Sequence, residues 1–153
     1  MTNETRSDLF QQTIIETLEE AAFIFATPAK EVLSWSKDKV LEARLSYTGE
    51  ATGTLMMAAT TDSIAEIAAN MLGLEPDEPD VEMKQADALG EMLNIIGGVV
   101  VEAWFGSESE VQLDVPRLRT LAVDEYERQL EQPKVSLTFE TEEGERIDAA
   151  VFA

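Results

Sequence analysis

The sequence predicts an α+β fold: a mainly antiparallel sheet with two long helices and one shorter helix packed on it. Two observations support this class. Segments with helical periodicity are interspersed with segments that have the period-two pattern of strands, and their order lacks the regular strand–helix–strand repeat of a parallel sheet. The chain has 153 residues and no long linker, so we expect residues 1–153 to form a single domain.

The N-terminal third predicts a helix and a hairpin. Apolar residues follow one side of a helix from Leu9 to about Phe25, and Thr27-Pro28 is expected to end it. The stretch from there to Lys39 has no clear period and is expected to be a loop or a short turn. Val40–Tyr47 then alternates apolar and polar residues, and a glycine-containing turn connects it to a second strand, Ala51–Ala59.

The middle of the chain predicts a central strand and two helices. The run Leu55-Met56-Met57 is apolar on both faces, which indicates a strand covered on each side. Ser63-Ile64-Ala65-Glu66 has the spacing of a capping box and is expected to begin a helix that Gly73 can end. After an acidic linker, Asp80 is a suitable N-cap for a third helix that reaches about Phe105.

The C-terminal part predicts three more strands. Val111–Val115 alternates, and Pro116 is expected to stop that strand. Leu118–Leu130 is compatible with either strand or helix. Two alternating segments, Val135–Phe139 and Ile147–Val151, then form a hairpin on a Glu-Gly turn. The two helix-plus-hairpin halves of the chain have the same order of elements, which suggests a distant internal repeat.

The third helix has two distinct faces. At about 100° per residue, the stripe that faces the core is expected to hold Leu89, Leu93, Ile96, Val100 and Ala103. The opposite side carries Asp87, Glu91, Asn94 and Gly98. The carboxylate of Glu91 and the amide of Asn94 therefore lie one turn apart and project together into solvent. Ile95 and Val101 lie beside this polar side and are expected to be exposed apolar residues on which a partner can dock.

The pair Gly97-Gly98 costs helix propensity, roughly 0.5–1 kcal/mol for each glycine relative to alanine. Packing has to offset this cost, and we assign close packing within the chain to Gly97 and the close approach of a partner to Gly98. For the polar residues, ordinary solvation of an outer helix face is the alternative that the pattern leaves open.

The composition excludes several classes of function. With 31 Asp+Glu against 11 Lys+Arg, the formal charge is -20, which disfavours binding to nucleic acids and to anionic membranes. The chain has no Cys and no His, so thiolate or imidazole catalysis and the usual zinc sites are excluded. The acidic linker lacks the ligand spacing of a calcium loop, and no metal site is expected. Neither a signal sequence nor a long apolar run occurs, so we expect a cytoplasmic protein.

The segment Glu91–Gly98 resembles the Glu-x-x-Asn helix of the CheC/CheX/FliY phosphatases of bacterial chemotaxis, most closely the CheX-like members. Thr48–Leu55 resembles the glycine-marked hairpin of that family, and Ile64–Gly73 resembles its helix ending in Met-Leu-Gly. Val115-Pro116 lies about where the family has a proline after the strand that follows the motif helix. The resemblance covers roughly residues 7–120.

The resemblance implies a phosphatase that hydrolyses the aspartyl phosphate of a CheY-like response regulator. It implies that the amide of Asn94 positions the attacking water and that Glu91 pairs with the regulator's active-site lysine. No cofactor is implied on this chain, because the receiver domain brings its own Mg²⁺. The resemblance also implies a homodimer, in which the strand at the end of the chain pairs or swaps with a second copy.

CheC-type members resemble a duplicate with Glu-x-x-Asn on both long helices. The first helix here reads Glu16-Thr17-Leu18-Glu19, without the asparagine, so we expect one site. Two other functions remain compatible with the sequence: a non-catalytic adaptor that binds a receiver in a two-component or chemotaxis pathway, and a structural subunit that assembles through sheet edges. The motif alone does not choose between them.

Overall fold

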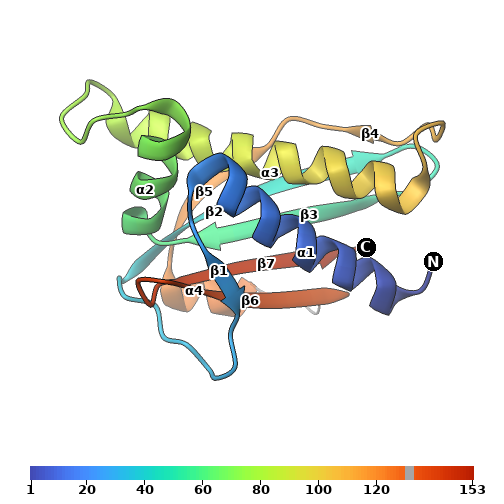
Figure 1. Cartoon of the computed structure of the whole chain (residues 1–153), viewed down its shortest axis with the longest axis horizontal. Helices are drawn as coiled ribbons and strands as arrows, with labels where there is room; N and C mark the ends of the chain where they lie inside the picture. The colour runs from blue at the N-terminus through green and yellow to red at the C-terminus, as the bar shows by residue number, and fades with distance from the viewer. Residues whose placement is uncertain (130–132) are drawn as a thin grey trace.

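The computed structural model describes residues 1–129 and 133–153, which form a seven-stranded antiparallel sheet with helices on both faces (Figure 1). The helices within these residues are α1 (Asn3–Ala22), α2 (Thr61–Leu72), α3 (Val81–Phe105) and α4 (Val123–Gln129). The strands are β1 (Ala26–Pro28), β2 (Lys39–Thr48), β3 (Gly53–Ala59), β4 (Gln112–Leu113), β5 (Arg117–Ala122), β6 (Val135–Thr141) and β7 (Arg146–Phe152). The predicted α+β class is confirmed, with α1, α2 and α3 on one face and α4 on the other.

The first helix begins earlier and ends earlier than predicted. The Thr2 side chain caps it by accepting a hydrogen bond from the Thr5 amide, and Phe23 ends it in the left-handed conformation with φ of 53°. Phe25, predicted to continue the apolar side of the helix, is therefore exposed. The residues that follow form strand β1, where a loop was predicted. Pro28 is tolerated there because β1 pairs only with β6, at an edge of the sheet.

The sheet has the order β1-β6-β7-β3-β2, and β4 and β5 both pair with the outer side of β2. As predicted, β3 is covered on both faces. Leu55 and Met57 face the main core under α1, α2 and α3, and Met56 lies in a smaller core with Tyr126 of α4. The chain itself therefore supplies the second cover through α4 and its neighbour Trp35.

The segment Leu118–Leu130, whose sequence was compatible with either strand or helix, contains both. Its first part is β5 and its second part is α4, while Leu130 lies outside the described residues. The strand predicted over Val111–Val115 is only Gln112–Leu113 (β4) and ends before Pro116, as predicted, but pairing with β2 resumes at Arg117 in β5. β4 and β5 form the outer edge of the sheet on this side. Proline is tolerated at such an edge because its missing N–H does not deprive another strand of a hydrogen-bond donor.

Two predicted helix starts differ from the structure. Helix α2 begins at Thr61, so Ser63 lies buried inside its first turn and does not cap it. Asp80 is the N-cap residue of α3, as predicted, but its backbone is left-handed and its side chain makes no capping hydrogen bond. The end of α2 at Gly73, in the left-handed conformation that glycine favours, is confirmed.

The suspected internal repeat is visible in the topology. Without β4, the strand order is β1-β6-β7-β3-β2-β5. If β1 is exchanged with β5, β2 with β6 and β3 with β7, the same order results, read from the other end. Helices α1 and α3 precede these equivalent sets of strands and pack against each other over the sheet (Figure 1). The two halves are therefore related by an approximate two-fold axis between β3 and β7.

The last strand is interior and not at an edge. β7 pairs with β3 on one side and with β6 on the other, so it can pair with a second copy only by leaving its own sheet. Of the two arrangements expected, direct pairing of this strand with a second copy is therefore blocked by β3 and β6, and a strand swap stays a prediction. The edges of the sheet are β1 with the part of β6 before Thr138 on one side, and the β4–β5 side of β2 on the other.

Helix α3 is long and apolar enough to cross a membrane by length and composition alone. However, 56% of its most apolar window is buried in this fold. Its apolar residues pack on the sheet and on α1, as expected of a core helix.

A buried polar cluster fixes α4 and the loop before β2 to the second face of the sheet. Asp148 of β7, which is only 5% exposed, accepts hydrogen bonds from the Tyr126 hydroxyl at 2.8 Å, the Thr138 hydroxyl at 3.0 Å and the Arg146 guanidinium at 2.8 Å. Arg146 also donates to the Leu33 carbonyl at 2.7 Å. Burial raises the pKa of Tyr126 far above its usual range, so the phenol stays protonated and remains a donor to Asp148.

Candidate functional site

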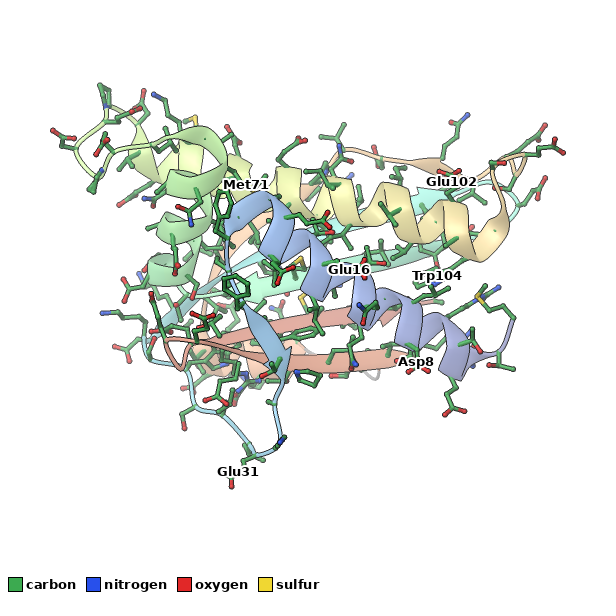
Figure 2. The ribbon with its side chains drawn as sticks, viewed as in Figure 1. Asp8, Glu16, Glu31, Met71, Glu102 and Trp104 are labelled. Carbon is green, nitrogen blue, oxygen red and sulfur yellow. The ribbon has the colours of Figure 1, made fainter. Side chains whose placement is uncertain are left out.

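The predicted two-faced character of α3 is confirmed in its central turns. Leu89, Leu93, Ile96 and Val100 are fully buried, and Asp87, Glu91, Asn94 and Gly98 are exposed. Ala103 was predicted to be in the core but is exposed, and Trp104 takes that place. Trp104 packs edge to face on Phe10 of α1, where the end of α3 meets that helix (Figure 2).

Glu91 and Asn94 are on the same side of α3 and are both open to solvent. Within residues 1–129 and 133–153, neither side chain takes part in a hydrogen bond or an ion pair. The helix backbone beneath them is held by four buried side chains and by the neighbouring glycines. A carboxylate and an amide are thus held on a rigid support without partners of their own, and both can engage a docked protein.

The chain that follows α3 covers one flank of this helix and exposes the other. After Phe105 it turns back and runs antiparallel to α3, so that Leu113 lies against Gly97, and Pro116 and Leu118 lie against Gly90. This return segment buries Val101, which is only 6% exposed. The prediction that Val101 is an exposed contact for a partner is therefore wrong. Ile95, on the other flank, is 38% exposed as predicted.

The return segment adds residues to the candidate site that the pattern of α3 did not reveal. Val115, Pro116 and Leu118 line a shallow hollow of about 180 Å³ together with Glu91 and Asn94. Val115 is 74% exposed and forms an apolar rim on this hollow. The position of Val115-Pro116 after a predicted strand was the only sequence signal for this rim, because the contact joins residues far apart in the chain.

The two glycines of α3 have different surroundings. A Cβ atom on Gly97 would lie 2.7 Å from Cδ2 of the buried Leu45, whereas a Cβ on Gly98 would meet nothing within 4 Å. Close packing at Gly97 is confirmed. Gly98 instead leaves the helix surface open beside a second hollow of about 350 Å³ that Val111 and Leu113 help to line. The role of Gly98 in docking remains a prediction.

Substitution of these glycines by alanine is expected to have opposite effects. Gly98→Ala should raise the free energy of unfolding by about 0.5–1 kcal/mol, because the helix gains propensity and nothing is displaced. Gly97→Ala should lower it by about 1 kcal/mol, because overpacking against Leu45 outweighs the same gain. Urea denaturation of the two variants measures both values, and equal effects would contradict the packing difference.

Helix α1 presents an equivalent surface without the amide. Glu16 and Glu19 are exposed on it while Thr17 and Leu18 between them are buried, the same pattern as Glu91 to Asn94. Glu16 lies on the solvent side of α1 (Figure 2). Because Glu19 carries a carboxylate where α3 has Asn94, this face repels an anionic phosphoryl group and cannot donate a hydrogen bond to water as an amide does. The expectation of one site per chain stays a prediction.

Among the described residues, no group of three or more Asp or Glu side chains is placed to hold a metal ion. Oxygen ligands are what Mg²⁺ and Ca²⁺ require.

Comparisons with known proteins agree with the fold. A family model described as chemotaxis phosphatase CheX matches residues 42–140. A search of curated proteins by sequence gives no match. The solved structure of CheX from Desulfovibrio desulfuricans is 18% identical and has a TM-score of 0.71, with 96% of this chain and 97% of that chain covered.

Two further solved structures share the fold over nearly their whole length. CheX from Vibrio vulnificus is 16% identical with a TM-score of 0.73, and 99% of each chain is covered. A CheX–CheY complex with BeF3 and Mg²⁺ from Borrelia burgdorferi is 14% identical with a TM-score of 0.72, and 95% of each chain is covered. The family model spans more than half of the 153 residues. Together with the α+β architecture and the Glu91–Asn94 face, this match shows that the chain belongs to the CheX family of chemotaxis phosphatases.

Proposed function

We propose that this protein hydrolyses the aspartyl phosphate of a CheY-like response regulator. In this proposal, Asn94 positions the attacking water and Glu91 pairs with the lysine of the receiver's active site. The observation that carries it is the exposure of Glu91 and Asn94 together on the rigid face of α3, with no partners among the described residues. Family membership and the existence of a CheX–CheY complex in the Borrelia relative support it.

The chemistry needs little from this chain. Water attacks the phosphorus, the bond between phosphorus and the aspartyl oxygen breaks, and the products are inorganic phosphate and a free carboxylate. An acyl phosphate is already reactive, and in this proposal the receiver supplies Mg²⁺ to neutralise the developing charge. What remains is to hold the water in line with the breaking bond, which an amide can do without changing its protonation state.

The required acceleration is modest. A 100-fold rate increase corresponds to about 2.7 kcal/mol of barrier, within the range that one well-placed hydrogen bond and orientation can supply. The absence of His and Cys from the sequence is therefore no obstacle. A general base is not needed on this chain.

The remaining predicted contacts extend this docking surface. Asp87 and Gly98 lie on the same side of α3 one turn before Glu91 and one turn after Asn94, and Ile95 with Val115 provides apolar contact at its borders. An apolar border shields the contact between Glu91 and the receiver lysine from bulk solvent when a partner docks, while the single water held by Asn94 stays in the site. The ion pair between Glu91 and the receiver lysine then forms in a less polar setting than on the free surface.

The test of the proposal is the decay of a phosphorylated receiver with and without this protein. A faster decay supports hydrolysis. Unchanged decay together with measurable binding would leave the alternative, a non-catalytic adaptor that docks a receiver in a two-component or chemotaxis pathway. Unchanged decay without binding contradicts both.

Replacement of Glu91 is expected to weaken docking more than chemistry. Glu91→Gln keeps the shape of the side chain and removes its charge, so the KM for the phosphorylated receiver should rise about tenfold while kcat changes less. Glu16→Gln on the equivalent face of α1 is the matched control and should leave KM unchanged. An unchanged KM for Glu91→Gln would contradict the proposed pairing with lysine.

A homodimer remains a prediction for this chain. Because β7 is paired on both sides, a dimer that extends the sheet without strand exchange would use an outer edge, which is β1, the part of β6 before Thr138, or the β4–β5 side of β2. Sedimentation velocity at several protein concentrations measures the oligomeric state. A single species with the mass of one chain at all concentrations would contradict the dimer.

A further inference from the structure

The face of the sheet opposite α1 and α3 contains a groove lined with arginines. Its volume is about 700 Å³, within the range of small-molecule sites. The lining includes Arg44 of β2, Arg117 and Arg119 of β5 and Arg128 of α4. The chain has only 11 Lys+Arg against 31 Asp+Glu, so four cations in one groove are a strong local concentration of positive charge.

The strand register places like charges side by side in this arginine groove. Arg44 and Arg117 are direct partners across β2 and β5, so both side chains leave the sheet on the same face. A direct pair of like charges destabilises a sheet, and Glu42 offsets this repulsion only in part, because it pairs with Arg44 and not with Arg117. The next pair along the strands, Glu42 and Arg119, has opposite charges and does not have this cost.

The carboxylates of the groove are already engaged. Glu42 is 1% exposed, and its Oε1 atom accepts hydrogen bonds from the Nε atoms of Arg44 and Arg119, each at 2.8 Å. Asp114 accepts a hydrogen bond from the amide of Val115 at 2.8 Å. Within residues 1–129 and 133–153, no carboxylate forms an ion pair with Arg117 or Arg128. The described lining therefore carries four guanidinium groups and two carboxylates, a net excess of positive charge.

The other lining residues suit a polar ligand. Ser46 and Thr54 stand opposite each other on β2 and β3, and their hydroxyl oxygens are 3.3 Å apart. The guanidinium of Arg44 lies over the ring of Phe152 at 4.6 Å, which holds its plane in place. Whichever of the two hydroxyls accepts from the other keeps its own O–H free to donate to an oxyanion, while an arginine fork binds the anion in a bidentate manner.

We propose that the arginine groove is a binding site for a small organic anion that carries two phosphate or carboxylate groups. One anionic group lies between Arg117, which has no ion pair among the described residues, and Arg44, which shares the single carboxylate of Glu42 with Arg119; the second is within the reach of Arg119 and of Arg128. The site is on the opposite face of the sheet from the helices, and it shares Val115 and Leu118 with the hollow beside Asn94. Binding of the anion does not require Glu91 or Asn94.

Isothermal titration calorimetry with pyrophosphate and with citrate, at constant ionic strength in sodium chloride, tests this site and distinguishes phosphate from carboxylate ligands. We expect at least one of the two anions to bind the wild type. Arg117→Gln should raise its dissociation constant about tenfold, because one charge-assisted bidentate contact is lost. The control Lys30→Gln removes the same charge from an exposed loop residue outside the groove and should leave binding unchanged.

Thermal unfolding with and without ligand provides a second test. If Arg117 had only a structural role, its replacement would not remove the increase in melting temperature that the ligand causes. Without ligand, Arg117→Gln should be at least as stable as the wild type, because the like-charge pair with Arg44 is relieved. With ligand, the wild type should gain in melting temperature and the variant should not. Failure of both anions to bind, or equal weakening by Lys30→Gln and Arg117→Gln, would overturn the proposal.

Discussion

Asn94→Ala is expected to abolish the acceleration of receiver dephosphorylation while binding to the receiver persists. The alanine removes the only amide on the exposed side of α3 that lies next to Glu91, so the attacking water is no longer held in line with the phosphorus. Loss of an acceleration of about 100-fold corresponds to about 2.7 kcal/mol. Single-turnover decay of the phosphorylated receiver measures the rate, and titration with a stable phosphoryl mimic on the receiver measures binding.

The structure offers a matched control for this variant. Glu19→Ala changes the exposed residue of α1 that is equivalent to Asn94, and it should leave the decay rate unchanged. Asn94 is exposed and makes no contact in the core, so the fold should be retained in both variants. A decay rate of Asn94→Ala equal to that of the wild type would show that water positioning by this amide is not the mechanism.

Asp148→Ala is expected to cause the largest loss of stability, about 3–5 kcal/mol, because it removes one partner of a buried ion pair. The Tyr126 hydroxyl and the Arg146 guanidinium would each lose a partner at 2.8 Å in a region where both are shielded from water. A typical domain has about 5–15 kcal/mol of total stability, so this variant should be close to unfolding at 37 °C. Urea denaturation followed by circular dichroism measures the change.

An exposed aspartate provides the comparison. Asp114→Ala removes a carboxylate at the edge of the sheet and should cost well under 1.5 kcal/mol, because its single hydrogen bond to a neighbouring amide is open to solvent. If Asp148→Ala cost no more than Asp114→Ala, the cluster would not be what holds α4 and the loop around Leu33 on the sheet.

The faces of α3 could be predicted from the sequence because helical periodicity is local. The spacing of Leu89, Leu93 and Ile96 defines which side is buried, and this also fixes Glu91 and Asn94 on the opposite side. The same reasoning failed at Val101, which lies on the outer side of the helix. There the return of the chain through β4 covers a flank that an isolated helix would expose.

Strand alternation had a similar limit. The pattern in β2 correctly separated Leu41 and Leu45 from Glu42, but it does not show how deeply Glu42 is buried. In the structure Glu42 is almost fully buried, since Arg44 and Arg119 both donate to it. Arg119 is distant from Glu42 in the sequence. The alternation within β2 alone does not show that β5, which carries Arg119, will be the neighbouring strand.

By itself, the sequence determined the fold class, the long third helix and the exposed carboxylate and amide on it, because each depends on spacing between nearby residues. Only the tertiary structure decided that Val101 is covered, that Pro28 lies in an edge strand and that Arg44 faces Arg117. These features depend on which distant segments meet and in which register. Such pairing is selected by burial and hydrogen bonding over the whole sheet, and no local pattern specifies it.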